Sequence, residues 1–151
     1  MTPHETFMHK ALLLAQEAAR YGEIPVGAVI VRHMDIIATG RNMNREKQDP
    51  TLHAEMIAIS KACRVMGNER LNDCVMYVTK EPCAMCAGAI VHARLDEVYI
   101  GTADPRYGAC GSALDICGNP ALNHVPKISF GILQQESAAL LSSFFKELRS
   151  K

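Results

Sequence analysis

The chain has 151 residues and a mass of 16.5 kDa, the size of one globular domain. Hydrophobic residues make up 48% and charged residues 21% of it, which excludes a wholly disordered chain. Lys plus Arg and Asp plus Glu both number 16, so any nucleic-acid partner must meet a local basic patch rather than a net positive charge. No stretch approaches the roughly 18 apolar residues of a membrane span. The N-terminal residues lack the pattern of a secretory signal, so we expect a cytoplasmic protein without membrane attachment.

Helical and strand patterns alternate along the chain, without an internal repeat or linker. Apolar residues recur at helical spacing over 4–20, and Gly22 and Pro25 end that helix. The uniformly apolar segment 26–31 is typical of a strand that is covered on both faces. Further strands are predicted at 36–39, 74–79, 97–100 and 127–133, and further helices from Asp49-Pro50 to about Val65, over 83–93 and over 137–148. This order predicts a single three-layer α/β domain over residues 1–151.

Two short motifs place metal-ligating side chains at two helix starts. They are His53-Ala54-Glu55 and Pro82-Cys83-Ala84-Met85-Cys86. The Cys-x-x-Cys spacing lets both sulfurs face one ion, and a helix N-terminus favours thiolate over thiol. His53 adds a neutral nitrogen. The sequence therefore predicts three protein ligands of a zinc site whose fourth position is left to water, as in catalytic sites.

Glu55 favours a catalytic site over a structural one. Its carboxylate stands beside the ligand histidine without being needed as a ligand, so it can take a proton from water and pass it to a leaving nitrogen. Other interpretations remain open, because Cys-x-x-Cys also occurs in structural zinc sites and redox pairs. Cys110 and Cys117 are candidates for a fourth ligand, although we expect them, with Cys63 and Cys74, to be ordinary thiols.

Together the motifs resemble those of the zinc-dependent nucleobase deaminases. The finer resemblance spans almost the whole chain and is to the bacterial tRNA-specific adenosine deaminases, in the cytidine/deoxycytidylate deaminase superfamily. The motifs that carry it are the segments 49–55 and 81–90, His92-Ala93-Arg94, Gly108-Ala109-Cys110-Gly111-Ser112, Asn123-His124 and Phe144-Phe145. The last three are the ones most specific to the tRNA enzymes.

The resemblance implies a three-layer α/β/α sandwich, with a mixed five-stranded sheet flanked by helices. It implies a hydrolase that acts on the C–N bond of a cyclic amidine, with one zinc ion per subunit. The substrate would be adenosine at the wobble position of a tRNA anticodon stem-loop, converted to inosine by attack of zinc hydroxide on C6 of the flipped-out base. The enzyme would be a homodimer.

Roles for individual residues also follow from the resemblance. His53, Cys83 and Cys86 would bind zinc, and Glu55 would shuttle protons. The residues expected to contact the substrate are Asn42 and the backbone amide of Ala54 at the purine, Ile24 and Val26 as apolar walls, Asp104 at the sugar and Phe145 beneath the anticodon. The candidates for contacts with the RNA backbone are Arg41, Arg45, Lys47, Arg94 and Arg106. The chain departs from the family pattern at Lys80, where leucine is frequent, and at Arg106-Tyr107, where lysine and a small residue are more usual.

Two other functions remain open at this point. A deaminase of free guanine, cytosine or a nucleoside such as cytidine would use the same zinc ligands and Glu55 without RNA. A non-catalytic, zinc-stabilised binding module would require a fourth protein ligand and would not need Glu55.

Overall fold

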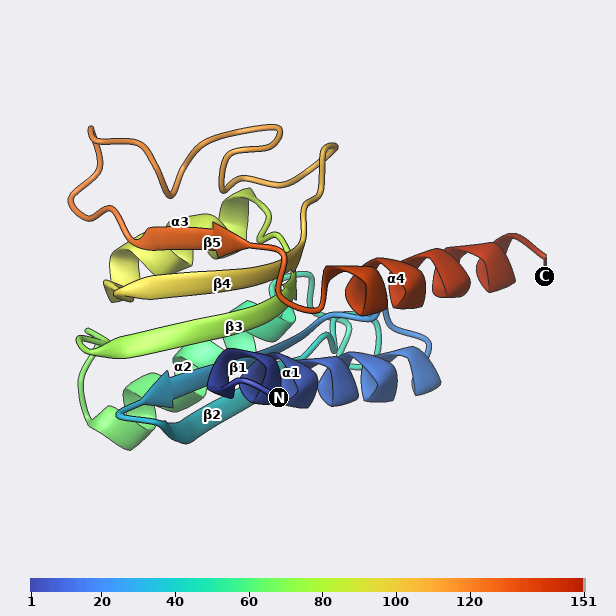
Figure 1. Cartoon of the computed structure of the whole chain (residues 1–151), viewed down its shortest axis with the longest axis horizontal. Coiled ribbons are helices and arrows are strands. Elements are labelled where there is room, and N and C mark those ends of the chain that lie inside the picture. The colour runs from blue at the N-terminus through green and yellow to red at the C-terminus, as the bar shows by residue number, and fades with distance from the viewer. Residues whose placement is uncertain (151) are drawn as a thin grey trace.

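The computed structural model describes residues 1–150, which form four helices and one mixed sheet of five strands (Figure 1). The helices are α1 (Pro3–Arg20), α2 (Ala54–Met66), α3 (Ala84–Ala93) and α4 (Gln134–Arg149). The strands are β1 (Gly27–Arg32), β2 (Asp35–Arg41), β3 (Cys74–Lys80), β4 (Glu97–Thr102) and β5 (Lys127–Phe130). Lys151, the last residue of the expected domain, lies outside the described residues. No helix within 1–150 combines the length and apolar character that crossing a membrane requires.

The strand order across the sheet is β2-β1-β3-β4-β5. β1 runs antiparallel to both β2 and β3, while β3, β4 and β5 run parallel. Parallel neighbours need a crossover, and α3 provides the one between β3 and β4. The carboxyl ends of β3 and β4 therefore meet at one edge of the sheet, and the chain enters α3 at that edge.

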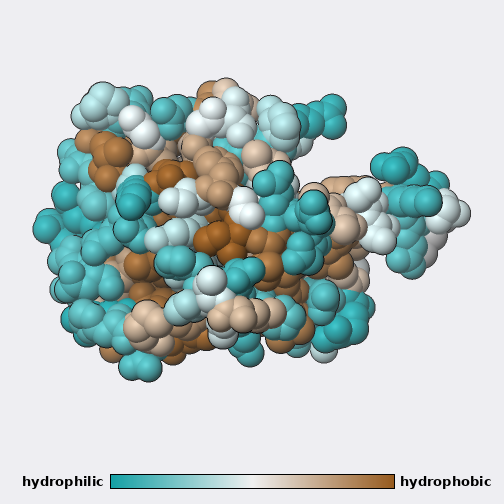
Figure 2. Space-filling model, in the orientation of Figure 1, coloured by the Kyte–Doolittle hydropathy of each residue, from teal (hydrophilic) through white to brown (hydrophobic). Residues whose placement is uncertain are grey.

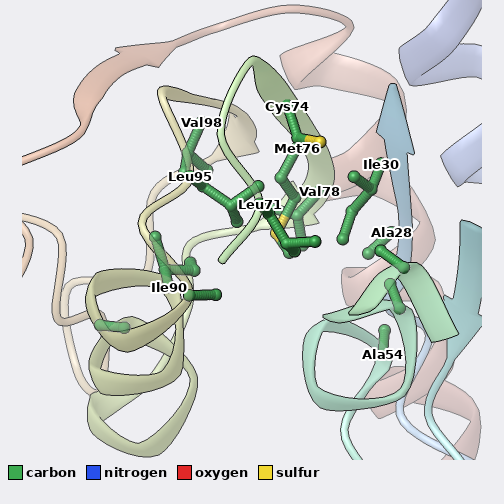
Figure 3. Close-up of a cluster of buried hydrophobic side chains, with 14 of the residues drawn as sticks. Ala28, Ile30, Ala54, Leu71, Cys74, Met76, Val78, Ile90, Leu95 and Val98 are labelled. Atoms are coloured by element: carbon green, nitrogen blue, oxygen red, sulfur yellow. The ribbon is translucent and has the colours of Figure 1, made fainter. Parts of the chain in front are cut away.

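Two pairs of helices cover the two faces of the sheet, which confirms the predicted three-layer sandwich. α1 and α4 pack on one face, while α2 and α3 pack on the other (Figure 1). In Figure 3, Ala54 of α2 and Ile90 of α3 face Met76 and Val78 of the central strand β3 across the buried core. The core on the α2 side depends on small residues. A Cβ at Gly40 would lie 2.3 Å from the carbonyl oxygen of Ala54, so glycine there lets the first turn of α2 lie directly on β2.

Three predicted boundaries were wrong by at least three residues. α2 begins at Ala54 rather than at Asp49-Pro50, because the Asp49 carboxylate accepts hydrogen bonds from the backbone N–H and the hydroxyl of Thr51. These bonds hold a turn instead of capping a helix. β5 ends at Phe130 rather than at 133, because Gly131 has a φ of +105° that an extended strand cannot use. α4 then starts at Gln134, three residues before its expected start.

Candidate active site

Three metal-ligating atoms meet where α2 and α3 begin. His53 is the N-cap residue of α2, Cys83 is the N-cap residue of α3, and Cys86 lies in the first turn of α3. His53 Nδ1 lies 3.6 Å from Cys83 Sγ and 3.5 Å from Cys86 Sγ, and all three ligand atoms lie within 4.8 Å of one another. A tetrahedral zinc ion with bonds of about 2.3 Å to sulfur and about 2.0–2.1 Å to nitrogen would separate N and S by about 3.6 Å. The donor set therefore has the chemistry and the spacing of a zinc site.

The two sulfurs differ in how readily they ionise before a metal binds. The hydrogen bond from Cys86, with a further one from His53, lowers the pKa of Cys83 to about 3 although its thiol is half-buried. The hydrogen bond to Cys83, together with burial, raises the pKa of Cys86. The pair thus holds one proton between two sulfurs. A divalent cation would displace that proton, because the thiolate is the metal-binding form.

Glu55 lies in the first turn of α2, two residues after His53, and is 4% exposed. Burial raises the pKa of its carboxyl group, which is the shift that a proton carrier working near neutral pH needs. Among the described residues, its carboxylate is not part of the group of mutually close ligand atoms. Glu55 is therefore placed beside the donor set rather than within it.

The remaining cysteines do not complete the donor set. Cys110 and Cys117 are buried and contact each other, with their sulfurs 3.1 Å apart. The group of potential metal ligands found within residues 1–150 contains neither of them. Cys74 is buried in β3, and the half-buried Cys63 donates to the carbonyl oxygen of Glu69. The fourth position around the three donors is thus left without a protein ligand among these thiols, as a catalytic site requires.

Asn42 connects the segment before β1 to the first residue of α2 by two hydrogen bonds. Its Oδ1 accepts the N–H of Ala54 at 2.8 Å, and its Nδ2 donates to the carbonyl oxygen of Ile24 at 3.0 Å. The Ala54 amide, expected to meet a purine, thus has a partner within the chain. Asn42 is 6% exposed and retains one N–H for a further acceptor. Val26 is also buried and donates its N–H to Ile24, so both expected wall residues belong to the same segment.

A cavity of about 420 Å³ brings several of the expected substrate contacts together. Its lining residues are Ile24, Lys80, Ala103, Asp104, Arg106, Tyr107, Leu141 and Phe145. They come from the segment before β1, the end of β3, the loop after β4 and helix α4. In Figure 2 the molecule is hollowed on the side where α4 projects from the body. The structure thus gathers Ile24, Asp104 and Phe145 from distant parts of the sequence.

The five basic residues expected at the RNA backbone do not form one patch. Arg106 lines the cavity, whereas Arg94 ends α3, about 15 Å of helix away from Cys83. Arg41 is already held by Glu17 and Glu46, and its guanidinium lies 4.5 Å from the centre of the Tyr21 ring. The exposed Arg45 and Lys47 lie in the loop before α2. Among these five residues, Arg106 is the one that lines the cavity together with the expected substrate contacts Ile24, Asp104 and Phe145.

Sequence reasoning missed Glu81, which organises the loop after β4. Glu81 is 2% exposed, and its carboxylate accepts the backbone N–H groups of Asp104, Cys110 and Ser112 as well as the Ser112 hydroxyl. Glu23 does the same for the loop before α2, where it accepts the N–H groups of residues 45 and 46. The one signal in the sequence for this role was the position of an acidic residue, Glu81, between an apolar strand and a proline. Its hydrogen-bond partners lie more than 20 residues away, so the sequence did not identify them.

Replacing Glu81 with Gln is expected to loosen the 103–112 loop, since the amide NH₂ of glutamine cannot accept hydrogen bonds. At least one buried donor would lose its partner, at a cost of about 1–3 kcal/mol of folding free energy. Hydrogen exchange of the amides of residues 104, 110 and 112 should be faster than in the wild type. Glu69→Gln, at an exposed position, is the matched control. Unchanged exchange in the Glu81 variant would mean that packing alone holds the loop.

Comparison with known proteins places this geometry among related structures. Residues 1–102 match the family model of the cytidine and deoxycytidylate deaminase zinc-binding region. The "tRNA-specific adenosine deaminase" of Bacillus subtilis (strain 168) is 40% identical over 151 residues, which is all of this chain and 94% of that protein. A structure from a study of A-to-I editing by tRNA:A34 deaminases has a TM-score of 0.87 and 42% identity, covering 90% of this chain and 99% of that one. The guanine deaminase of Bacillus subtilis has a TM-score of 0.65 and 36% identity, covering 98% of this chain and 94% of its own.

Proposed function

Because the chain belongs to the cytidine and deoxycytidylate deaminase family, we propose that it is a tRNA adenosine deaminase. It would hydrolyse adenosine to inosine at the wobble position of an anticodon stem-loop, adding water at C6 and releasing ammonia. The observation that carries the reaction type is the donor set of His53, Cys83 and Cys86 with the buried Glu55 beside it. The observation that favours RNA is the full-length similarity to tRNA-specific relatives.

The residues of the chain divide the chemistry between them. His53, Cys83 and Cys86 would hold one zinc ion per subunit. Bound there, zinc supplies a water activated as a nucleophile near neutral pH. Glu55 would take the proton from that water and deliver protons to the base and to the leaving ammonia. Its burial suits both steps, because a raised pKa lets one carboxyl group accept and donate near neutral pH.

The substrate would be positioned by the groups around this centre. Asn42 would offer its free N–H to the purine edge while it holds the Ala54 amide. Ile24, Asp104 and Phe145 line the neighbouring cavity, which is where the rest of the target nucleotide and its flanking bases would lie. Assembly as a homodimer and a cytoplasmic location remain predictions. Light scattering and metal analysis of the purified protein would check the dimer and the one-zinc stoichiometry.

The test of the function is to incubate zinc-loaded protein with a stem-loop RNA that carries adenosine at the wobble position. Parallel reactions would contain the same stem-loop with that adenosine moved by one position, free guanine and cytidine. We expect inosine in the first RNA only. Release of ammonia from guanine with intact RNA would favour the second candidate, a free-base deaminase. The similarity to the guanine deaminase of Bacillus subtilis is the reason for this control.

Replacing Asn42 with Ala is expected to slow deamination of the stem-loop without loss of zinc. The change removes the acceptor for the buried Ala54 N–H and the donor to the Ile24 carbonyl, which should also cost about 1–3 kcal/mol of stability. Turnover, metal content and melting temperature would be compared with Asn72→Ala, an exposed position. Wild-type turnover in Asn42→Ala would exclude the proposed contact with the purine.

A further inference from the structure

We propose that Lys80 is a specificity-determining residue whose ammonium group binds a phosphate of the RNA strand beside the target nucleotide. Such a contact would favour a polynucleotide over a free base or nucleoside. The inference rests on the proposed function, because it concerns how that same substrate is selected. It depends on three features of the structure: the position of Lys80, the charges around it and the hydrogen bonds that it leaves open.

Lys80 lines the cavity and lies close in sequence to the donor set. It is the last residue of β3, three residues before Cys83, and three residues of chain span at most about 11 Å. Its side chain reaches into the wall of the cavity shared with Leu141 and Phe145 of α4. A base held beside Cys83 would therefore leave its flanking phosphates within reach of the lysine side chain.

The charges of the cavity wall favour an anion. Lys80 and Arg106 provide two cations, while Asp104 provides the one carboxylate among the lining residues. That carboxylate is well supplied with donors, since Oδ2 lies 3.2 Å from Lys80 Nζ and Oδ1 accepts the backbone N–H groups of Arg106 and Tyr107. One positive charge is thus left over at the cavity, which suits the single charge of a phosphodiester.

The ammonium group of Lys80 keeps donors for a second partner. It carries three N–H groups, and within residues 1–150 the pair with Asp104 is the one ion pair or hydrogen bond found for it. The Lys80 side chain is 26% exposed and that of Asp104 is 13% exposed, so the pair is accessible from the cavity. Partly exposed ion pairs add little to folding stability, so the charge is available for binding without a large structural cost. Asp104 holds the ammonium in place.

The experiment measures how RNA binding depends on salt in the wild type, Lys80→Gln and Lys80→Arg. Lys61→Gln is the matched control, because it removes the same charge from an exposed position on α2. Binding of the zinc-loaded protein to the stem-loop would be followed by fluorescence anisotropy over a range of salt concentrations. KM and kcat would be measured on the same RNA.

We expect Lys80→Gln to reduce the slope of log K against log salt by about 0.7, the value for one contact with a single strand. With equal affinities at about 1 M salt, this corresponds to about eight-fold weaker binding at about 50 mM salt. KM should rise with little change in kcat, because the contact is made in the ground state and in the transition state alike. Lys80→Arg should keep the wild-type slope, and Lys61→Gln should leave both slope and KM unchanged.

An unchanged slope in Lys80→Gln would overturn the proposal, and so would an equal change in Lys61→Gln. A fall in kcat with an unchanged slope would also overturn it, since Lys80 would then act by positioning Asp104. Failure of the proposed function looks different. In that case the wild-type protein itself would leave the wobble adenosine intact, whichever residue stands at position 80.

Discussion

Replacing Glu55 with Gln should reduce deamination by more than the factor of about 10²–10⁴ that one general acid–base step contributes. Glutamine keeps the size of the side chain but carries no exchangeable proton of suitable pKa. Under the proposed function two kinds of proton transfer would depend on Glu55, from the attacking water and to the leaving ammonia, so losing both should exceed the effect of losing one. Single-turnover formation of inosine in the stem-loop would measure the loss, with Glu69→Gln as the exposed control.

Glu55→Gln is also expected to keep the zinc content of the wild type. Because the Glu55 carboxylate lies outside the group of close ligand atoms, the variant should bind zinc with the wild-type stoichiometry. Elemental analysis of the purified variant would show this. Activity within ten-fold of the wild type would exclude Glu55 as the proton carrier. Loss of zinc together with activity would instead mean that the carboxylate supports the donor set.

The donor set was predictable from the sequence because each part of it is local. Cys83 and Cys86 are one helical turn apart, and both His53 and Cys83 stand directly before a helix, where side chains project from the same edge of the sheet. The sandwich was predictable for the same kind of reason, since strand and helix patterns depend on short segments. The start of α2 was not, because a competing turn at Asp49 uses the same residue type that caps helices.

The surroundings of the donor set could not be predicted from local patterns. The cavity is lined by Ile24, Lys80, Asp104 and Phe145, which meet only when four separate segments fold together. Glu81 likewise finds its partners more than 20 residues further along. Resemblance to a family supplied Ile24, Asp104 and Phe145, but it could not supply Lys80, where this chain departs from the family pattern.

Replacing Cys83 with Ser should remove most of the zinc and lower the melting temperature. Serine is a good N-cap residue, so α3 should keep its start and the effect should come from the lost thiolate. Zinc at a free concentration of about 1,000 times its Kd adds about 4 kcal/mol to the stability of the folded state. Losing that amount lowers the melting temperature of a 150-residue domain by about 10 °C.

Metal analysis and thermal melting would test this together, with Cys63→Ser as the control thiol that lies outside the donor set. A chelator should lower the melting temperature of the wild type and of Cys63→Ser by the same amount, and should hardly change that of Cys83→Ser. The two effects must coincide, because the site joins the starts of α2 and α3 and exists only in the folded chain. A metal-free Cys83→Ser protein that melts at the wild-type temperature would contradict this coupling.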